Sequence, residues 1–170
     1  MKFPFLRHHG TKPSHKDGLG DSKPAIKPSA SAMKEGIATT SKKKLSDCNV
    51  LVLDDNADNA ELARLYLRKS AKSVDTAETA QEAIEKMQKN KYDIVLSDMS
   101  LGGGMTGLDV EKKAKELLPG ILYAYATGRD RDGFARMFPG QEYPEHVLQK
   151  PVHQADLLEF LNKLLEKQQS

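Results

Sequence analysis

The sequence predicts a doubly wound α/β domain with a five-stranded parallel sheet in the order 2-1-3-4-5. Five short apolar runs alternate with five segments of helical periodicity over about 125 residues, which is typical of parallel sheets covered by helices on both faces. Several runs end directly on an acid, a hydroxyl or a lysine, as expected where strands release side chains into a crevice at their carboxyl ends. This strand order is the commoner one for five strands.

The first strand is expected over residues 48–53, and it ends at two acids, Asp54 and Asp55. A helix follows, for which Asp58 suits the N-cap because Glu61 stands three residues later. The apolar face of this helix is expected to consist of Leu62, Leu65 and Tyr66.

The second strand is expected over residues 73–77, and a capping box formed by Thr79 and Glu82 starts the next helix. The apolar stripe of that helix is Ala80, Ala83, Ile84 and Met87. The third strand is expected over residues 92–98. It is rich in β-branched residues, too short for a helix, and ends on Asp98.

The second half of the domain repeats the alternation. A helix is expected over residues 108–118, a strand over 121–126, a weaker helix over 130–138 and a short strand over 147–149. The last helix is expected over residues 156–167, with a stripe of five leucines: Leu157, Leu158, Leu161, Leu164 and Leu165.

The charge of the chain is unevenly distributed. Residues 1–45 hold ten basic and three acidic residues, a net charge of +7, whereas the rest of the chain carries −5. Four prolines, four glycines and no sustained apolar period predict a disordered basic tail over residues 1–45, followed by a folded domain over residues 46–170.

Three other interpretations of the tail stay open. Its basic residues, including the run at 42–44, could contact nucleic acid or an anionic membrane. His8, His9 and His15 could bind a metal, although no Cys or acid completes a site at ligand spacing. Met33 could be the true start. A plain solvated tail is favoured over each of these, and with it a protein that does not bind nucleic acid.

Cysteine content and apolar runs bear on the compartment. Cys48 is the single cysteine, so an internal disulfide is excluded and a reducing compartment fits. No apolar run approaches the roughly 18 residues of a membrane helix, and the first seven residues lack the apolar core of a secretory signal. We therefore expect a cytoplasmic protein without membrane insertion.

The strand ends predict a site. In the expected order, the crevice falls between the first and third strands, which end at Asp54, Asp55 and Asp98. Three converging acids repel each other, so they need a cation or raised pKa values. Mg²⁺ with carboxylate and water ligands is the natural choice of cation. Thr127 and Lys150 follow the fourth and fifth strands and add a hydroxyl and an ammonium. Together these groups suit phosphoryl transfer, with Asp98 as nucleophile.

Each of these residues has an ordinary interpretation when taken alone, as a helix-start charge, a turn or a strand exit. Their joint position at strand ends gives the signal its weight. A dinucleotide site is disfavoured because Asp54-Asp55, not a glycine loop, follows the first strand. The three glycines at 102–104 precede no Lys-Ser/Thr pair, so they form no phosphate-binding loop.

At this order and spacing, the sequence resembles the receiver domain of two-component response regulators over nearly the whole folded part. The motifs that carry the resemblance are Val50-Leu51-Val52-Leu53-Asp54-Asp55, Tyr92-Asp93-Ile94-Val95-Leu96-Ser97-Asp98, Gly107-Leu108-Asp109-Val110, Ala126-Thr127-Gly128 and Lys150-Pro151. The resemblance implies a flavodoxin-like receiver fold. It also implies that the domain catalyses its own phosphorylation and dephosphorylation, without being a metabolic enzyme.

The resemblance assigns roles to the site residues. Asp98 would accept a phosphoryl group from a sensor histidine kinase or a histidine phosphotransfer protein. Asp54, Asp55 and Asp98, with the backbone carbonyl of Ser100, would hold Mg²⁺. Two further residues, Thr127 and Lys150, would contact the phosphoryl oxygens.

Three departures from the family pattern stand out. The loop after Asp98 is glycine-rich, which is similar to receivers found with hybrid sensor kinases. Val147 occupies the position of the aromatic switch residue, three residues before Lys150. Ser100 and Arg129 stand two residues after the acceptor and the threonine, where we expect their side chains to screen the phosphoryl group and tune its lifetime.

The predicted function is that of a single-domain response regulator, since no output domain is expected after residue 167. Its output would be contact with an unknown downstream protein, a phosphorelay or a phosphate sink, and the missing aromatic favours the last two. The alternative is a pseudo-receiver that scaffolds a partner without phosphorylation. Retention of all five acceptor-site residues argues against that alternative.

Overall fold

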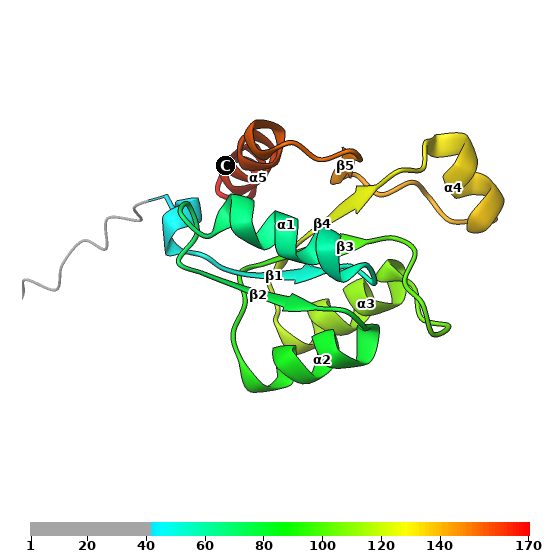
Figure 1. Cartoon of the computed structure of the whole chain (residues 1–170), viewed down its shortest axis with the longest axis horizontal. Helices are drawn as coiled ribbons and strands as arrows, with labels where there is room; N and C mark the ends of the chain where they lie inside the picture. Colours follow the sequence, from blue (N-terminus) through cyan, green and yellow to red (C-terminus); the bar gives the residue numbers. More distant parts are fainter. Residues whose placement is uncertain (1–41) are drawn as a thin grey trace, which may run out of the picture. The chain divides into compact units, whose positions relative to one another are not determined.

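The structure is a computed structural model that describes residues 42–170, so nearly all of the predicted tail lies outside the described residues. The sheet has five parallel strands in the order β2-β1-β3-β4-β5, which confirms the predicted topology (Figure 1). The strands are β1 (Asn49–Leu53), β2 (Ser73–Ala77), β3 (Ile94–Asp98), β4 (Leu122–Thr127) and β5 (Val147–Gln149).

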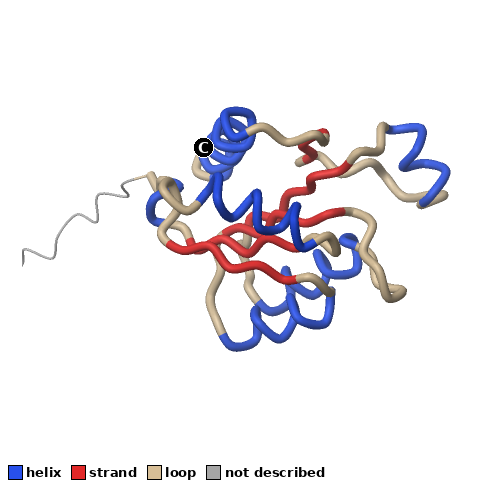
Figure 2. Tube along the Cα trace, in the orientation of Figure 1, coloured by secondary structure: helices blue, strands red, loops and turns tan. Residues whose placement is uncertain are grey.

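Helices cover both faces of the sheet, as the strand–helix alternation predicted (Figure 2). α1 (Ala57–Leu67) and α5 (Gln154–Gln168) pack on one face, and α2 (Ala80–Lys89) and α3 (Gly107–Leu117) on the other. Alternate residues of a strand pack into the cores on opposite faces of the sheet, because successive side chains point to opposite faces. In β1, for example, Val50 and Val52 join the α1–α5 core, whereas Leu51 and Leu53 join the α2–α3 core.

Two further elements are short. A 3-10 turn, η1 (Leu45–Asp47), precedes β1, and α4 (Arg131–Met137) follows β4 with Asp130 as its N-cap. α4 projects away from the sheet in Figure 1 and attaches mainly through its buried Phe134. None of the helices between residues 42 and 170 is long and apolar enough to span a bilayer.

The predicted start of the first helix is wrong. Asn56, not Asp58, is the N-cap of α1, because its side-chain oxygen accepts hydrogen bonds from the backbone N–H groups of Asp58 and Asn59. The predicted capping box of α2 is half right. Thr79 caps the helix, but the Glu82 carboxylate accepts from the N–H of the preceding Glu78 and leaves the box open.

The predicted apolar face of α1 is wrong for two of its three residues, whereas the third, Tyr66, packs against the α1–α5 core as predicted. Leu62 and Leu65 are 44% and 39% exposed, and the helix instead buries Ala60 and Leu67 against α5 and the sheet. The predicted stripes of α2 and α5 are confirmed, since their members are buried or packed against the core.

The folded body begins earlier than predicted. Leu45, which we assigned to the tail, is buried in the α1–α5 core, and the Lys43 ammonium pairs with Asp93 at 2.6 Å. An apolar side chain and an ion pair therefore anchor residues 43–45. Their lysine-rich sequence had indicated only a solvated segment.

Candidate functional site

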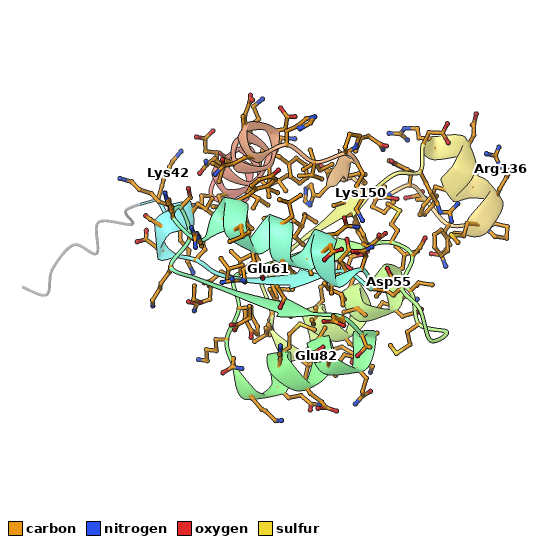
Figure 3. All side chains as sticks on the ribbon, in the orientation of Figure 1. Lys42, Asp55, Glu61, Glu82, Arg136 and Lys150 are labelled. Carbon is orange, nitrogen blue, oxygen red and sulfur yellow. The ribbon has the colours of Figure 1, made fainter. Side chains whose placement is uncertain are left out.

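Three carboxylates converge at the carboxyl edge of the sheet. Asp54 and Asp55 follow β1, and Asp98 ends the neighbouring β3. One oxygen from each lies within 4.8 Å of the others. Figure 3 shows Asp55 and Lys150 at this edge, whereas Lys42 lies at the far side of the domain. The convergence predicted from the strand order is present in the structure.

Lys150 neutralises part of this charge. It follows β5, and its Nζ donates hydrogen bonds to Oδ2 of Asp54 and Oδ2 of Asp98, each at 2.7 Å. Both carboxylates are largely buried, with side-chain exposures of 7% for Asp54 and 15% for Asp98. The ammonium therefore bridges two acids that would otherwise repel each other in a poorly solvated pocket.

Electrostatics in the pocket favour the charged form of Lys150. Burial disfavours the ammonium, but the hydrogen bonds to Asp54 and Asp98 and their negative charges outweigh that effect and raise the pKa of Lys150 above its ordinary value. The lysine is therefore a permanent cation at neutral pH.

Backbone and side-chain donors hold the other oxygens of the two bridged acids. The N–H of Asn56 donates to Asp54 Oδ1 at 3.0 Å, and the Asn59 amide donates to the same atom at 3.4 Å. The N–H of Ser100 donates to Asp98 Oδ1 at 3.0 Å. These contacts fix two carboxylates in place, while Asp55, the third acid of the cluster, is exposed.

The remaining predicted residues surround the acids on the β4 side. Thr127 ends β4 and is buried, and its hydroxyl accepts from the N–H of Arg129 at 3.2 Å. The Arg129 side chain reaches back to Ser100, where its Nε donates to the hydroxyl at 3.3 Å. Ser100 and Arg129 thus meet beside Asp98, as their positions in the sequence suggested. Val147 lies half-buried in β5 and packs against the α2–α3 core.

Gly107 allows α3 to start directly behind β3. A Cβ at this position would lie 2.3 Å from the backbone carbonyl oxygen of Asp98 and 3.1 Å from Ser97 Oγ. Only a residue without a side chain tolerates that approach. The carbonyl oxygen of Gly107 also accepts a hydrogen bond from the buried Tyr123 hydroxyl at 3.0 Å. The close packing keeps the end of β3 rigid where Asp98 emerges.

A cleft of about 410 Å³ opens between the acids and α1. Asp54, Asp98 and Lys150 line its polar end, and Leu62, Tyr66 and Val152 line its apolar end. The exposure of Leu62 is explained by this position, because the residue faces the cleft and not the core.

The donor set fits a hard divalent cation. Carboxylate oxygens from three acids within a few ångström, one of them exposed, are the ligands that Mg²⁺ prefers, with waters completing its coordination. The backbone of Ser100 lies against Asp98, and the proposed role of its carbonyl as a ligand stays a prediction.

Comparison with known proteins agrees with this geometry. The family model of the response regulator receiver domain matches residues 50–162. The chain belongs to this family. The receiver match spans all five strands and the three acids, so the fold and the acidic pocket of this chain are those of a receiver domain. The search of curated proteins gave no match.

Solved receiver structures share the fold. A CheY-like receiver domain from Methanospirillum hungatei JF-1 is 26% identical, with a TM-score of 0.61 over 73% of this chain and 98% of that one. A receiver protein from Sinorhizobium medicae WSM419 is 23% identical with the same TM-score and coverage. The chemotaxis regulator CheY4 of Vibrio cholerae is 22% identical, with a TM-score of 0.58 over 69% and 98% of the two chains.

Sequence reasoning missed several residues that support the receiver site. Asn56 and Asn59 were passed over because the N-cap was assigned two residues too late, to Asp58. Gly107 was seen only as part of a motif, although a glycine that opens a helix after a buried strand indicates close backbone approach. Tyr143 belonged to no pattern and Gln149 only to the end of a predicted strand, yet both contact the carbonyl of Arg129.

Proposed function

We propose that this receiver domain accepts a phosphoryl group on the Asp98 carboxylate from a phosphohistidine of a sensor histidine kinase or a histidine phosphotransfer protein. The observation that carries the proposal is the bridge from Lys150 to Asp54 and Asp98, at 2.7 Å each. It places an ammonium beside the acceptor oxygen, where negative charge on the arriving phosphoryl group needs a partner.

In this transfer an oxygen of Asp98 forms the new P–O bond while the P–N bond to the donor imidazole breaks. The imidazole keeps the electron pair of that bond. Lys150 pairs with a phosphoryl oxygen. Within residues 42–170 the Thr127 hydroxyl only accepts, from the N–H of Arg129, so its own O–H can donate to another phosphoryl oxygen. Hydrolysis of the aspartyl phosphate then returns the carboxylate, so the domain catalyses both steps on itself.

Asp54, Asp55 and Asp98, with the carbonyl of Ser100, would hold Mg²⁺ in this scheme. When bound, the cation neutralises charge on the transferred group and aligns it with the acceptor. The proposal rests on the carboxylate cluster, whose oxygens lie within 4.8 Å of one another.

The surroundings of the pocket suit a protein donor. The exposed Leu62 and the half-buried Tyr66 line the cleft that ends at Asp98, so apolar surface adjoins the acceptor. Apolar surface beside a reactive group is typical of a docking site. Output would follow by contact with a downstream protein, by relay or as a phosphate sink, and the aliphatic Val147 favours relay or sink over an aromatic switch.

The experiment is phosphate incorporation into the full chain from a small acyl-phosphate donor, with and without Mg²⁺. We expect labelling that depends on the metal and disappears in Asp98→Asn. The matched control is Asp58→Asn, which removes an exposed acid in the first turn of α1, outside the cluster, and should label like the wild type. Decay of the label then separates a long-lived switch from a fast sink.

A pseudo-receiver that only scaffolds a partner makes the opposite prediction. It would take no label and show no binding of Mg²⁺ in a titration. That pair of results would overturn the proposal.

A further inference from the structure

Tyr143 lies in the irregular segment between α4 and β5 and is held on several sides. Its ring packs edge-on against Phe134, with centroids 5.2 Å apart, and the Arg131 guanidinium lies 4.7 Å above it. The hydroxyl accepts a hydrogen bond from the Gln149 amide at 2.9 Å and donates to the Arg129 carbonyl at 3.5 Å. Neither Tyr143 nor Gln149 belongs to the acidic pocket.

Gln149 completes a closed triangle of hydrogen bonds. Its Nε2 donates both to the Tyr143 hydroxyl and to the Arg129 carbonyl, the latter at 3.2 Å. An amide nitrogen has two hydrogens and a phenol can accept and donate at once, so all three contacts form together. Two side chains therefore converge on one backbone oxygen in the loop after β4.

The Arg129 carbonyl anchors the turn that follows β4. The preceding residue, Gly128, is exposed and has no side chain to restrain it. The Arg129 N–H is tied to Thr127, its Nε to Ser100, and its carbonyl to Tyr143 and Gln149. The terminal guanidinium nitrogens have no hydrogen bond or ion pair with any residue in 42–170, so they remain available to an anion beside Asp98.

We infer that Tyr143 and Gln149 are positioning residues for phosphoryl chemistry, acting through Arg129. By holding the Arg129 carbonyl they keep its guanidinium beside Ser100, the residue whose N–H bonds the Asp98 carboxylate. From there it screens the phosphoryl group from water and prolongs the lifetime of that group. The inference rests on the proposed function, because it concerns the aspartyl phosphate that the proposal places on Asp98. It goes further by assigning two residues outside the pocket.

The test measures how fast the labelled full chain loses phosphate. Tyr143→Phe keeps the ring against Phe134, and Gln149→Met keeps the length of the side chain. Each variant removes the bond between Tyr143 and Gln149 and one of the two hydrogen bonds to the Arg129 carbonyl. Loss of one neutral hydrogen bond to that carbonyl supports a change of about three- to fivefold, so we expect the lifetime to shorten by that factor in each variant. Tyr92→Phe is the matched control. The Tyr92 hydroxyl donates to the Asp75 carboxylate at 2.7 Å, outside the acidic pocket, so the phosphoryl group should have the wild-type lifetime in this variant.

A second measurement separates positioning from general stability. In the Arg129→Ala background, Tyr143→Phe should shorten the lifetime no further, because the guanidinium through which it acts is gone. An equal effect in both backgrounds would overturn the inference, and so would an unchanged lifetime in both Tyr143→Phe and Gln149→Met. If the wild type takes no label at all, the proposed function itself fails, and the two failures are thereby distinguished.

Discussion

Replacing Lys150 by methionine removes the ammonium that lies between two largely buried carboxylates. Methionine preserves much of the length and apolar stem of lysine, so packing changes little and the charge is the main loss. Asp54 and Asp98 are then left facing each other with Asp55 nearby. We expect the variant to have a much smaller free energy of unfolding than the wild type in the absence of divalent metal.

The size of the effect follows from the geometry. Each Nζ–Oδ2 distance is 2.7 Å. At an effective dielectric constant of about 20, each pair attracts by roughly 6 kcal/mol, part of which is offset by desolvation of the ammonium. Removing one partner of a buried pair typically costs about 3–5 kcal/mol, a large share of the roughly 5–15 kcal/mol by which domains are stable.

The pH dependence of this contribution has a definite sign. Because the pKa of Lys150 is raised in the folded state, its stabilisation is fully present below the unfolded value of about 10.4 and is lost only as pH rises through the folded value. The free-energy difference between wild type and Lys150→Met attributable to Lys150 titration should therefore stay constant across the neutral range.

The assay is urea unfolding of the full chain followed by circular dichroism. Lys43→Met is the matched control, because it breaks an ion pair of 2.6 Å in which the lysine side chain is 47% exposed. An exposed pair should cost less than about 1 kcal/mol. Added Mg²⁺ should stabilise Lys150→Met more than the wild type, since the metal then meets three carboxylates without a competing ammonium.

Equal losses in Lys150→Met and Lys43→Met would refute this reasoning. Such a result would mean that the repulsion between the acids is screened by water and not relieved by the ammonium. A metal effect of the same size in both proteins would contradict the second half of the prediction.

Two further predictions concern α3. Gly107→Ala should lower the free energy of unfolding in urea by roughly 1–3 kcal/mol, because its Cβ would lie 2.3 Å from the Asp98 carbonyl oxygen. Gly128→Ala is the control and should be near neutral, because open space surrounds it. Equal losses in the two variants would contradict this prediction. Asp109→Asn should cost about 1 kcal/mol at neutral pH, because hydrogen bonds from the backbone and hydroxyl of Thr106 lower the pKa of that carboxyl. This stabilisation is present above the unfolded value of about 3.9 and disappears as pH falls through the folded one, so thermal unfolding of the two proteins should converge in strong acid.

The fold and the centre of the site could be predicted because both depend on strands. A buried strand of a parallel sheet is a short apolar run, and its carboxyl end has only one edge of the sheet to occupy. Asp54, Asp98 and Lys150 therefore converge once the strand order is known, although 96 residues separate Asp54 from Lys150.

The buried face of helix α1 was mispredicted because both the core and the cleft use its apolar residues. Periodicity alone assigns Leu62 to the core, but Leu62 lines the cleft beside the acids, and Ala60 and Leu67 are the buried residues of the helix instead. Tyr66 does both, since it lines the cleft and packs against the core. A sequence pattern reports that a residue is apolar and does not report whether a core or a cleft will contact it.

The loop after β4 escaped prediction for a different reason. Tyr143 stands in an irregular segment without periodicity, and its hydrogen bonds with Gln149 and the Arg129 carbonyl depend on where that segment returns to the sheet. Side-chain to backbone contacts between irregular segments have no spacing rule from which they could be inferred. They become visible only when the packing of Phe134 against Tyr143 fixes the return path.

The position of Lys150 links the chemistry of the site to completion of the fold. The acids come from β1 and β3, whereas the lysine follows β5, the last and shortest strand, which pairs only with β4. Before β5 docks, the three carboxylates face each other without the ammonium and oppose their own convergence. Docking of β5 relieves that repulsion and at the same time delivers the cation that the proposed phosphoryl transfer would need. An unpaired acidic cluster would therefore mark an incompletely folded domain, and a competent site would form only when all five strands are in place.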